Sequence, residues 1–224
     1  MVSRHPPVEV KVWGPYACFT RPEAKVERVT YPVMTPSSAR GVLEAIFWKP
    51  EFHWRINEIV VLNPVHYVGM LRNEVKSKIS EGTVKKWISK GCHESYFADA
   101  DRTQRHTLAL RNVAYVIRAT IELMPHAMND DPAKYRDQFR RRVSKGQCFH
   151  RPYLGCREFA ADFGEPDTDS PVELSDKLGH VLFDMRYTSD GSGRGAPIFF
   201  DAQIEDGVLR VPQHLYEQLE GGEQ

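Results

Sequence analysis

Two helix starts divide this chain and limit the folds that it can adopt. Thr35-Pro36 and Asp131-Pro132 each place a capping side chain directly before a proline, a combination that begins many helices. The first helix is expected over residues 37–48, with its apolar side chains on one face. The second is expected from residue 131 to about residue 145, and Gly146 ends it.

Alternating apolar and polar residues predict strands before, between and after these helices. The expected strands cover residues 8–19, 54–65, 108–124 and 152–163. Together with the helices they give the order β-α-β-β-α-β, the ferredoxin-like (RRM-like) arrangement of two helices on one face of an antiparallel sheet. The sequence therefore predicts an α+β fold over residues 1–165, with the polar region near 66–101 inserted as a hairpin or long excursion.

A second, smaller unit is expected after this domain. Residues 181–187 and 197–211 have the composition of strands, and a loop that reads SDGSGRGAP lies between them. The sequence therefore predicts a small C-terminal antiparallel β-sheet domain over residues 166–224.

Composition and cysteine spacing bound the class of protein. The hydrophobic share of 41% and the charged share of 27% are ordinary for a soluble globular chain. No apolar run reaches the roughly 20 residues of a membrane span, and the first residues lack the apolar core of a signal peptide. The four cysteines form no C-x-x-C pair, which favours free thiols and no structural metal. Together with the missing signal peptide and membrane span, this predicts a cytoplasmic protein without a membrane partner.

Charge is unevenly distributed in a chain whose formal net charge is zero. Residues 134–157 contain eight Lys or Arg and one acid, Asp137, whereas residues 158–176 contain seven acids and no Lys or Arg. Basic charge gathered in this way suggests a surface for a polyanion, although a charge run alone fits a solvated helix face equally well. The aromatic residues, glycines and His150 between the basic residues favour single-stranded RNA, which is held by phosphate contacts and stacking.

The basic residues are stronger candidates for binding than for catalysis. Arg140, Arg141 and Arg142 are consecutive, so they cover about 200° of a helix surface and cannot all face a core. The expected RNA contacts are Lys25, Arg28, Arg140, Arg141, Arg142, Lys145, His150, Arg151 and Arg157.

Three long segments carry a family resemblance. YPVMTPSSARGVLEAIFWKP, RNVAYVIRA and GQCFHRPYLGCREF occur in this order, at residues 31–50, 111–119 and 146–159. In these segments the chain resembles the CRISPR-associated Cas-five proteins of subtype d, from the type I-C system. The resemblance spans nearly the whole chain and is thinnest at residues 69–101 and after Thr168. It implies a ferredoxin-like N-terminal domain followed by a small β-sheet domain.

The resemblance also implies an activity and partners. It implies an endoribonuclease that cuts CRISPR precursor RNA at the 3′ base of each repeat hairpin, without a cofactor. The enzyme then keeps the 5′ handle of the guide inside the type I-C surveillance complex, so the repeat RNA and the other subunits are its expected partners. Members have also been associated with less specific DNA cleavage, which makes double-stranded DNA a second candidate partner and a divalent metal its cofactor.

RNA cleavage without a metal needs a base for the 2′-hydroxyl, cations for the charge on the phosphorane and an acid for the 5′-oxygen. The product carries a 2′,3′-cyclic phosphate. The resemblance implies a tyrosine at the position of Phe47, which has no hydroxyl, and a Lys-His pair at the start of the second helix. Here that segment reads Ala133-Lys134-Tyr135, without a histidine.

The candidate catalytic residues are therefore Lys134, Tyr135 and His106. Lys134 can supply charge or, if desolvated, act as a base, but it also fits a solvated face or a phosphate contact. Tyr135 can donate a proton, but it lies on an apolar stripe with Phe139 and Val143 and so also fits core packing. His106 is the nearest other imidazole by topology, and a lone histidine is usually not a catalyst.

Two other functions stay open. The Phe47 and Ala133-Lys134 positions favour a structural subunit that binds the handle without cutting RNA. A divalent-metal DNase would need several carboxylates around one ion. The acids at positions 162, 165, 167 and 169 could supply these, but their linker composition is first that of a solvated acidic segment.

Overall fold

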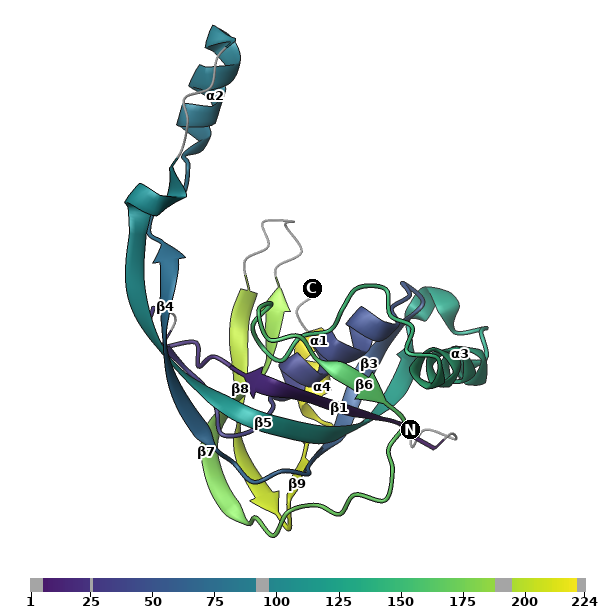
Figure 1. The fold of residues 1–224 in the computed structure, drawn as a ribbon. Coiled ribbons are helices and arrows are strands. Elements are labelled where there is room, and N and C mark those ends of the chain that lie inside the picture. Colours follow the sequence, from purple (N-terminus) through teal and green to yellow (C-terminus); the bar gives the residue numbers. More distant parts are fainter. Residues whose placement is uncertain (1–5, 25, 92–96, 188–194, 221–224) are drawn as a thin grey trace.

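One long strand, β5 (Arg102–Leu123), pairs with four other strands of the protein (Figure 1). It is antiparallel to β1 (Val8–Ala17), β3 (Phe52–Val61) and β4 (Tyr67–Val75), and parallel to the short β2 (Arg28–Val29). The computed structural model describes residues 6–24, 26–91, 97–187 and 195–220.

The strands form a continuous sheet in the order β6-β1-β5-β3-β9-β8-β7. Every neighbouring pair along this path is antiparallel. The outer strands are β6 (Asp162–Gly164), β7 (Asp176–Tyr187), β8 (Gly195–Glu205) and β9 (Val208–Arg210). The C-terminal strands therefore extend the N-terminal sheet, because β9 pairs with β3.

Two helices begin at the predicted positions and pack on the sheet. Thr35 caps α1 (Pro36–Ile46) and accepts a hydrogen bond from the amide of Ser38, 3.3 Å away. Asp131 caps α3 (Pro132–Ser144) in the same way. Short helices α2 (Glu81–Lys90) and α4 (Leu215–Glu220) and the 3₁₀ turns η1 (Ala98–Asp101) and η2 (Pro125–Ala127) complete the described elements. Within the described residues, no helix combines the length and apolar character that a membrane crossing requires.

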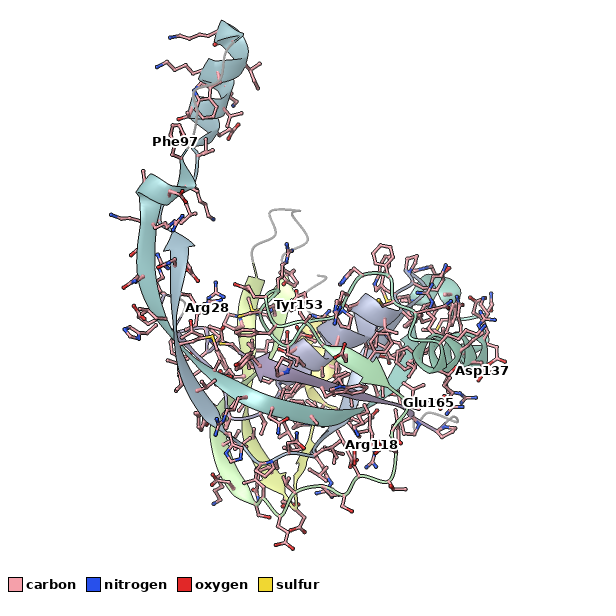
Figure 2. The ribbon with its side chains drawn as sticks, in the orientation of Figure 1. Arg28, Phe97, Arg118, Asp137, Tyr153 and Glu165 are labelled. Atoms are coloured by element: carbon pink, nitrogen blue, oxygen red, sulfur yellow. The ribbon has the colours of Figure 1, made fainter. Side chains whose placement is uncertain are left out.

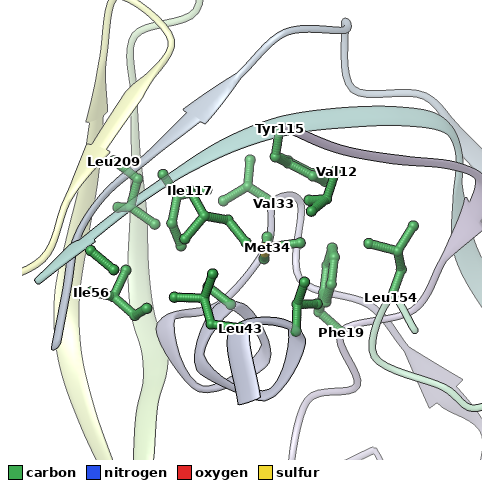
Figure 3. Close-up of a cluster of buried hydrophobic side chains, with 14 of the residues drawn as sticks. Val12, Phe19, Val33, Met34, Leu43, Ile56, Tyr115, Ile117, Leu154 and Leu209 are labelled. Atoms are coloured by element: carbon green, nitrogen blue, oxygen red, sulfur yellow. The ribbon is translucent and has the colours of Figure 1, made fainter. Parts of the chain in front are cut away.

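The apolar core lies between the helices and one face of the sheet (Figure 3). Leu43 of α1 lies beneath Tyr115 and Ile117 of β5, and Leu209 of β9 joins the same cluster. These side chains come from both ends of the sequence, so the C-terminal strands share the core of the N-terminal sheet.

A buried ion pair joins α1 to β7. Arg40 donates to both carboxylate oxygens of Asp184, at 2.7 and 2.8 Å, and Ser37 donates to the same carboxylate at 3.2 Å. Asp184 is the one charged residue that is buried in the part of the chain that the structure describes. A buried carboxylate is stable only while its partners remain in place, so this contact fixes α1 against the C-terminal strands.

The polar region near residues 66–101 forms an arm that projects from the sheet (Figure 1). β4 and the first half of β5 make a two-stranded ribbon with α2 at its far end. None of the residues of α2 is buried. Val84 and Ile88 of this helix and the nearby Phe97 expose apolar side chains.

The expected strand over residues 152–163 was mostly wrong. Only its end is part of β6, and before that Tyr153 and Ala160 form an isolated bridge around a tight turn. Gly155 adopts a φ of +83°, and a Cβ on it would lie 2.1 Å from the carbonyl oxygen of Cys18. Glycine is needed at this turn, and the close approach to Cys18 prevents the segment from extending as a strand.

We predict that Arg40→Ala lowers the free energy of unfolding by about 3 kcal/mol, because it leaves Asp184 buried without its cation. Urea denaturation followed by circular dichroism measures the change. Lys85→Ala is the control, since its pair with Glu81 is 73% and 81% exposed and should contribute less than about 0.5 kcal/mol. Equal effects of the two substitutions would contradict the structural role of the Arg40–Asp184 pair.

Candidate nucleic-acid interface

Three side chains meet at the start of α3. The Tyr135 ring is buried, with its centroid 5.1 Å from that of Phe52, and its hydroxyl donates to Oδ2 of Asp130. Nζ of Lys134 lies 2.9 Å from the same oxygen and 4.6 Å from the centroid of the Tyr135 ring. Lys134 is more than half exposed, so the cluster offers solvent an ammonium beside a carboxylate and a phenol.

The cluster sets the protonation state of its members. The hydrogen bonds from Tyr135 and Lys134 lower the pKa of Asp130. The same carboxylate raises the pKa of Lys134 and the pKa of Tyr135. At neutral pH Lys134 is therefore an ammonium and Tyr135 a neutral phenol. Lys134 can supply positive charge, but an exposed amine with a raised pKa is not suited to act as a general base.

Phe47 lies next to this cluster, at the end of α1. Its buried ring is 5.6 Å from that of Phe52, which in turn contacts Tyr135. The Arg142 guanidinium lies 5.3 Å from the centroid of the Phe47 ring, and its Nη1 donates to the Ile46 carbonyl at 3.0 Å. The fold thus brings together the two segments that the resemblance pairs, although they are far apart in the sequence.

His106 is not brought to this cluster. It lies on β5 opposite Leu71 of β4, where its amide donates to Glu27 at 2.5 Å. The end of β5 that meets α3 is near Ile121, which lines a small cavity together with Pro132. Fifteen residues of β5 separate His106 from Ile121, a length of about 50 Å along the strand at a rise of about 3.3 Å per residue. His53 of β3 is nearer, because it follows Phe52, whose ring contacts Tyr135, so the expectation that His106 is the nearest imidazole was wrong.

The three consecutive arginines of α3 divide into two groups. Arg140 and Arg141 are exposed, as is Lys145 at the end of the helix. Arg142 is half-buried, because it satisfies the carbonyl of Ile46 and covers the Phe47 ring. Arg140, Arg141 and Lys145 are available to an RNA backbone, whereas Arg142 mainly holds α1 against α3.

The loop after α3 carries exposed cations and rings along α1. The amides of Phe149 and His150 both donate to the Ala45 carbonyl, at 2.9 and 3.2 Å, which fixes the loop to the end of that helix. The side chains of both residues are exposed. Arg151 follows and pairs with Asp162 at 3.0 Å. Exposed rings beside cations are the features that bind single-stranded nucleic acid.

Beyond this loop lies a depression that contains two of the predicted RNA contacts. Its lining residues are Thr20, Arg28, Tyr153, Gly155, Cys156, Arg157 and Glu158. Figure 2 labels Arg28 and Tyr153, which come from segments far apart in the chain. Lys25 belongs to the same set of predictions, but it lies outside the described residues.

The Arg28 guanidinium is held by acidic and sulfur partners. It lies 3.3 Å from Glu74 and 3.8 Å from Glu158, and its Nη1 donates to Sγ of Cys156 at 3.2 Å. The Cys18 thiol and the Arg28 guanidinium together lower the pKa of Cys156 below its ordinary value. Arg72 and Arg105, which the sequence analysis did not single out, extend this network onto β4 and β5.

The acidic linker is folded back onto basic side chains. Lys11 of β1 binds both Asp167 and Asp169, and Arg151 binds Asp162. Within the described residues, no three His, Cys, Asp or Glu side chains are placed to hold a metal ion together. The linker acids therefore do not fit a divalent-metal site.

Comparison with known proteins gives consistent matches over almost the whole chain. A family model described as "CRISPR-associated protein (Cas_Cas5)", named Cas_Cas5d, matches residues 8–212. The CRISPR pre-crRNA endoribonuclease Cas5d of Thermus thermophilus is 45% identical over 95% of this chain and 94% of its own length. The protein of the same name from Mannheimia succiniciproducens is 40% identical, over 95% of this chain and 97% of its own.

Solved structures share the fold at lower identity. A structure described as a CRISPR-associated protein has a TM-score of 0.64 at 20% identity, over 92% of this chain and 91% of the other. The functionally uncharacterized protein SMU1763c from Streptococcus mutans also has a TM-score of 0.64, at 18% identity over 93% of each chain. A chain of a CRISPR RNA-guided surveillance complex has a TM-score of 0.51 at 12% identity, over 96% and 98%. Such identities show a common fold alone.

The division among the arginines of α3 predicts separable effects. Arg140→Ala and Arg141→Ala should each reduce the slope of log affinity against log salt by about 0.7, with unchanged stability, because each removes one phosphate contact. Arg142→Ala should instead lower the free energy of unfolding by about 1–2 kcal/mol, because the Ile46 carbonyl loses its donor. RNA titrations at several salt concentrations and urea denaturation provide the two readouts. Loss of stability in Arg140→Ala and Arg141→Ala, with a reduced salt slope in Arg142→Ala, would show that the roles of these arginines are assigned wrongly.

Proposed function

The chain belongs to the CRISPR-associated Cas5d family, and we propose from this membership that it is an endoribonuclease that cuts CRISPR precursor RNA. The observation that carries the proposal is the 45% and 40% identity, over 95% of the chain, to two CRISPR pre-crRNA endoribonucleases. The proposed substrate is the repeat hairpin, cut at the 3′ base of its stem. The exposed cations of α3 and of the following loop support an RNA substrate, because contacts to phosphates dominate the affinity of a protein for RNA.

The proposed chemistry needs no metal and uses the cluster at the start of α3. The 2′-oxygen attacks the adjacent phosphorus, and the bond from phosphorus to the 5′-oxygen breaks. Lys134, which stays protonated, stabilises the charge of the phosphorane. Tyr135 donates the proton to the leaving 5′-oxygen, and Asp130 holds its hydroxyl before that step. Water takes the proton of the 2′-hydroxyl, so the products carry a 2′,3′-cyclic phosphate and a 5′-hydroxyl.

A second candidate function is a handle-binding subunit that does not cut RNA. The buried Phe47 has no hydroxyl, and Tyr135 is buried with its hydroxyl bound to Asp130. These observations favour a structural role for this corner of the fold. A DNase that uses a divalent metal on double-stranded DNA is a third function, but the linker acids do not fit such a site, so no step is assigned to a metal.

We propose that the chain keeps the 5′ handle and assembles with the other subunits of a type I-C surveillance complex in the cytoplasm. The arm supports such contacts, because Val84, Ile88 and Phe97 expose apolar side chains at its end.

We also propose that residues 1–165 form a ferredoxin-like unit and residues 166–224 a β-sheet appendage. The antiparallel order β6-β1-β5-β3, with α1 and α3 between its strands in sequence, supports the first unit. The hairpin of β7 and β8, joined to the sheet by β9, supports the second.

We predict that the protein cuts its repeat hairpin in EDTA at a single position. Lys134→Ala should slow cleavage about 100-fold, because it removes the cation beside the phosphorane, and Tyr135→Phe should slow it by a similar factor. Single-turnover assays with labelled RNA measure both rates. Lys177→Ala, an exposed lysine on β7, should cut at the wild-type rate. Tight binding of the hairpin without cleavage by the wild type would establish the handle-binding function instead.

The pH dependence provides a separate test of the cluster. The pKa values of Lys134 and Tyr135 are both raised from ordinary values of 10.5 and 10.0, so both groups stay protonated well above neutral pH. Between pH 5.5 and 8.5 we therefore expect no inflection in the cleavage rate near about 6.5, where a histidine titrates. A bell-shaped profile centred in this range would show that a histidine takes part and would contradict the assignment.

A further inference from the structure

The depression that Arg28, Tyr153 and Glu158 line has the size of a small-ligand site. It measures about 630 Å³, within the range of about 300–1,000 Å³ that is typical of such sites. Its walls come from the start of the chain, from β2 and from residues 153–158, so the folded sheet assembles it.

Tyr153 offers this depression an exposed ring on a rigid backbone. The side chain is 37% exposed. Hydrogen bonds on both sides of Tyr153 fix the turn, since the Leu154 amide donates to Phe159 at 2.8 Å and the Ala161 amide donates to Pro152 at 2.9 Å. A tyrosine held in this way can stack on a nucleobase at little entropic cost.

The charges around the depression do not suit a simple phosphate pocket. Arg28 and Arg157 line it, but Glu158 lines it as well, and the carboxylate of Glu74 lies 3.3 Å from Arg28. A bare anion would meet these carboxylates at close range. The edge of a nucleobase, in contrast, presents donors and acceptors side by side.

The donors and acceptors are held in fixed positions. Arg72 of β4 binds Glu158 at 2.8 Å and Glu74 at 2.9 Å, and these ion pairs hold both carboxylates in place. The amide of Glu158 itself, together with Arg72 and Arg28, lowers the pKa of Glu158. Glu158 is therefore an acceptor at neutral pH, and Arg28 beside it is a donor.

Guanine has the edge that matches this pairing. Its N1 and N2 carry adjacent N–H groups that a carboxylate can accept together, and its O6 and N7 are acceptors for a guanidinium. Unpaired RNA bases are commonly read by stacking together with such edge contacts. We infer that the depression formed by Arg28, Tyr153 and Glu158 is a subsite that reads an unpaired guanine of the bound RNA.

This inference deepens the proposed function and rests on it for the identity of the RNA. The loop that carries Tyr153 begins at the end of α1, beside Phe47, where the amides of Phe149 and His150 bind Ala45. An RNA strand that follows this loop passes from the proposed cleavage cluster to the depression. Arg28 pairs with Thr107 of β5, beside His106, so the subsite would read a base several nucleotides away from the cut and fix the register of the bound RNA from there.

The test measures binding of RNA that cannot be cut. Fluorescence anisotropy is recorded with 2′-O-methyl heptanucleotides that contain adenosine at every position except the fourth, which is G, A, C or U. We expect the G probe to bind about fivefold more tightly than the other three. Glu158→Gln should remove this preference, because one of its two acceptors becomes a donor. Tyr153→Ala should weaken the G probe about tenfold.

Controls separate this result from misfolding and from the cleavage activity. Tyr187→Ala, which removes an exposed tyrosine of β7, and Glu173→Gln in the linker should leave all four affinities unchanged. Tyr153→Leu keeps an apolar side chain at the turn and should still lose affinity for the G probe. Equal wild-type affinity for all four probes, a preference for another base, or normal binding by folded Tyr153→Leu would overturn the inference. Because the probes resist cleavage, an inactive nuclease would not affect these outcomes.

Discussion

The pairing of β5 with strands along its 22 residues is the constraint on which the rest of the structure depends. One half of the strand pairs with β1 and β3 and supports the core and both helices, and the other half pairs with β4 to form the arm. A strand of this length keeps its two ends apart. The cluster of Lys134, Tyr135 and Asp130 therefore lies at one end of β5. His106, Arg72 and Arg105 lie at the other end, where the arm begins.

Local signals in the sequence predicted the elements whose causes are themselves local. The Thr35-Pro36 and Asp131-Pro132 pairs located both helices, because capping and proline act within one turn. The strand expected over residues 152–163 was wrong for a non-local reason. Gly155 packs against the Cys18 carbonyl, a contact between segments that are more than a hundred residues apart in the sequence. No window of sequence around Gly155 contains that information.

The candidate site shows the same limit. Sequence identified basic residues, but partners brought by the fold decide what each one does: Arg142 caps α1, Arg28 is bound by Glu74 and Cys156, and Arg140 stays exposed. Asp130 was missed, although its position four residues before Lys134 is a signal for a helix-start contact. The family resemblance led to the proposed activity, and the raised pKa of the exposed Lys134 favours a cation over a base in the proposed chemistry.

We propose that the 2′-hydroxyl of the RNA is the nucleophile, with Lys134 and Tyr135 assisting and no metal required. The most direct measurement is cleavage in EDTA of a series of repeat hairpins, each with one 2′-deoxynucleotide at a different position around the base of the stem. Every hairpin should bind equally well, and a deoxynucleotide at one single position should abolish cleavage. Cleavage of every hairpin in the series at the wild-type rate would show that another nucleophile attacks, and would contradict the account.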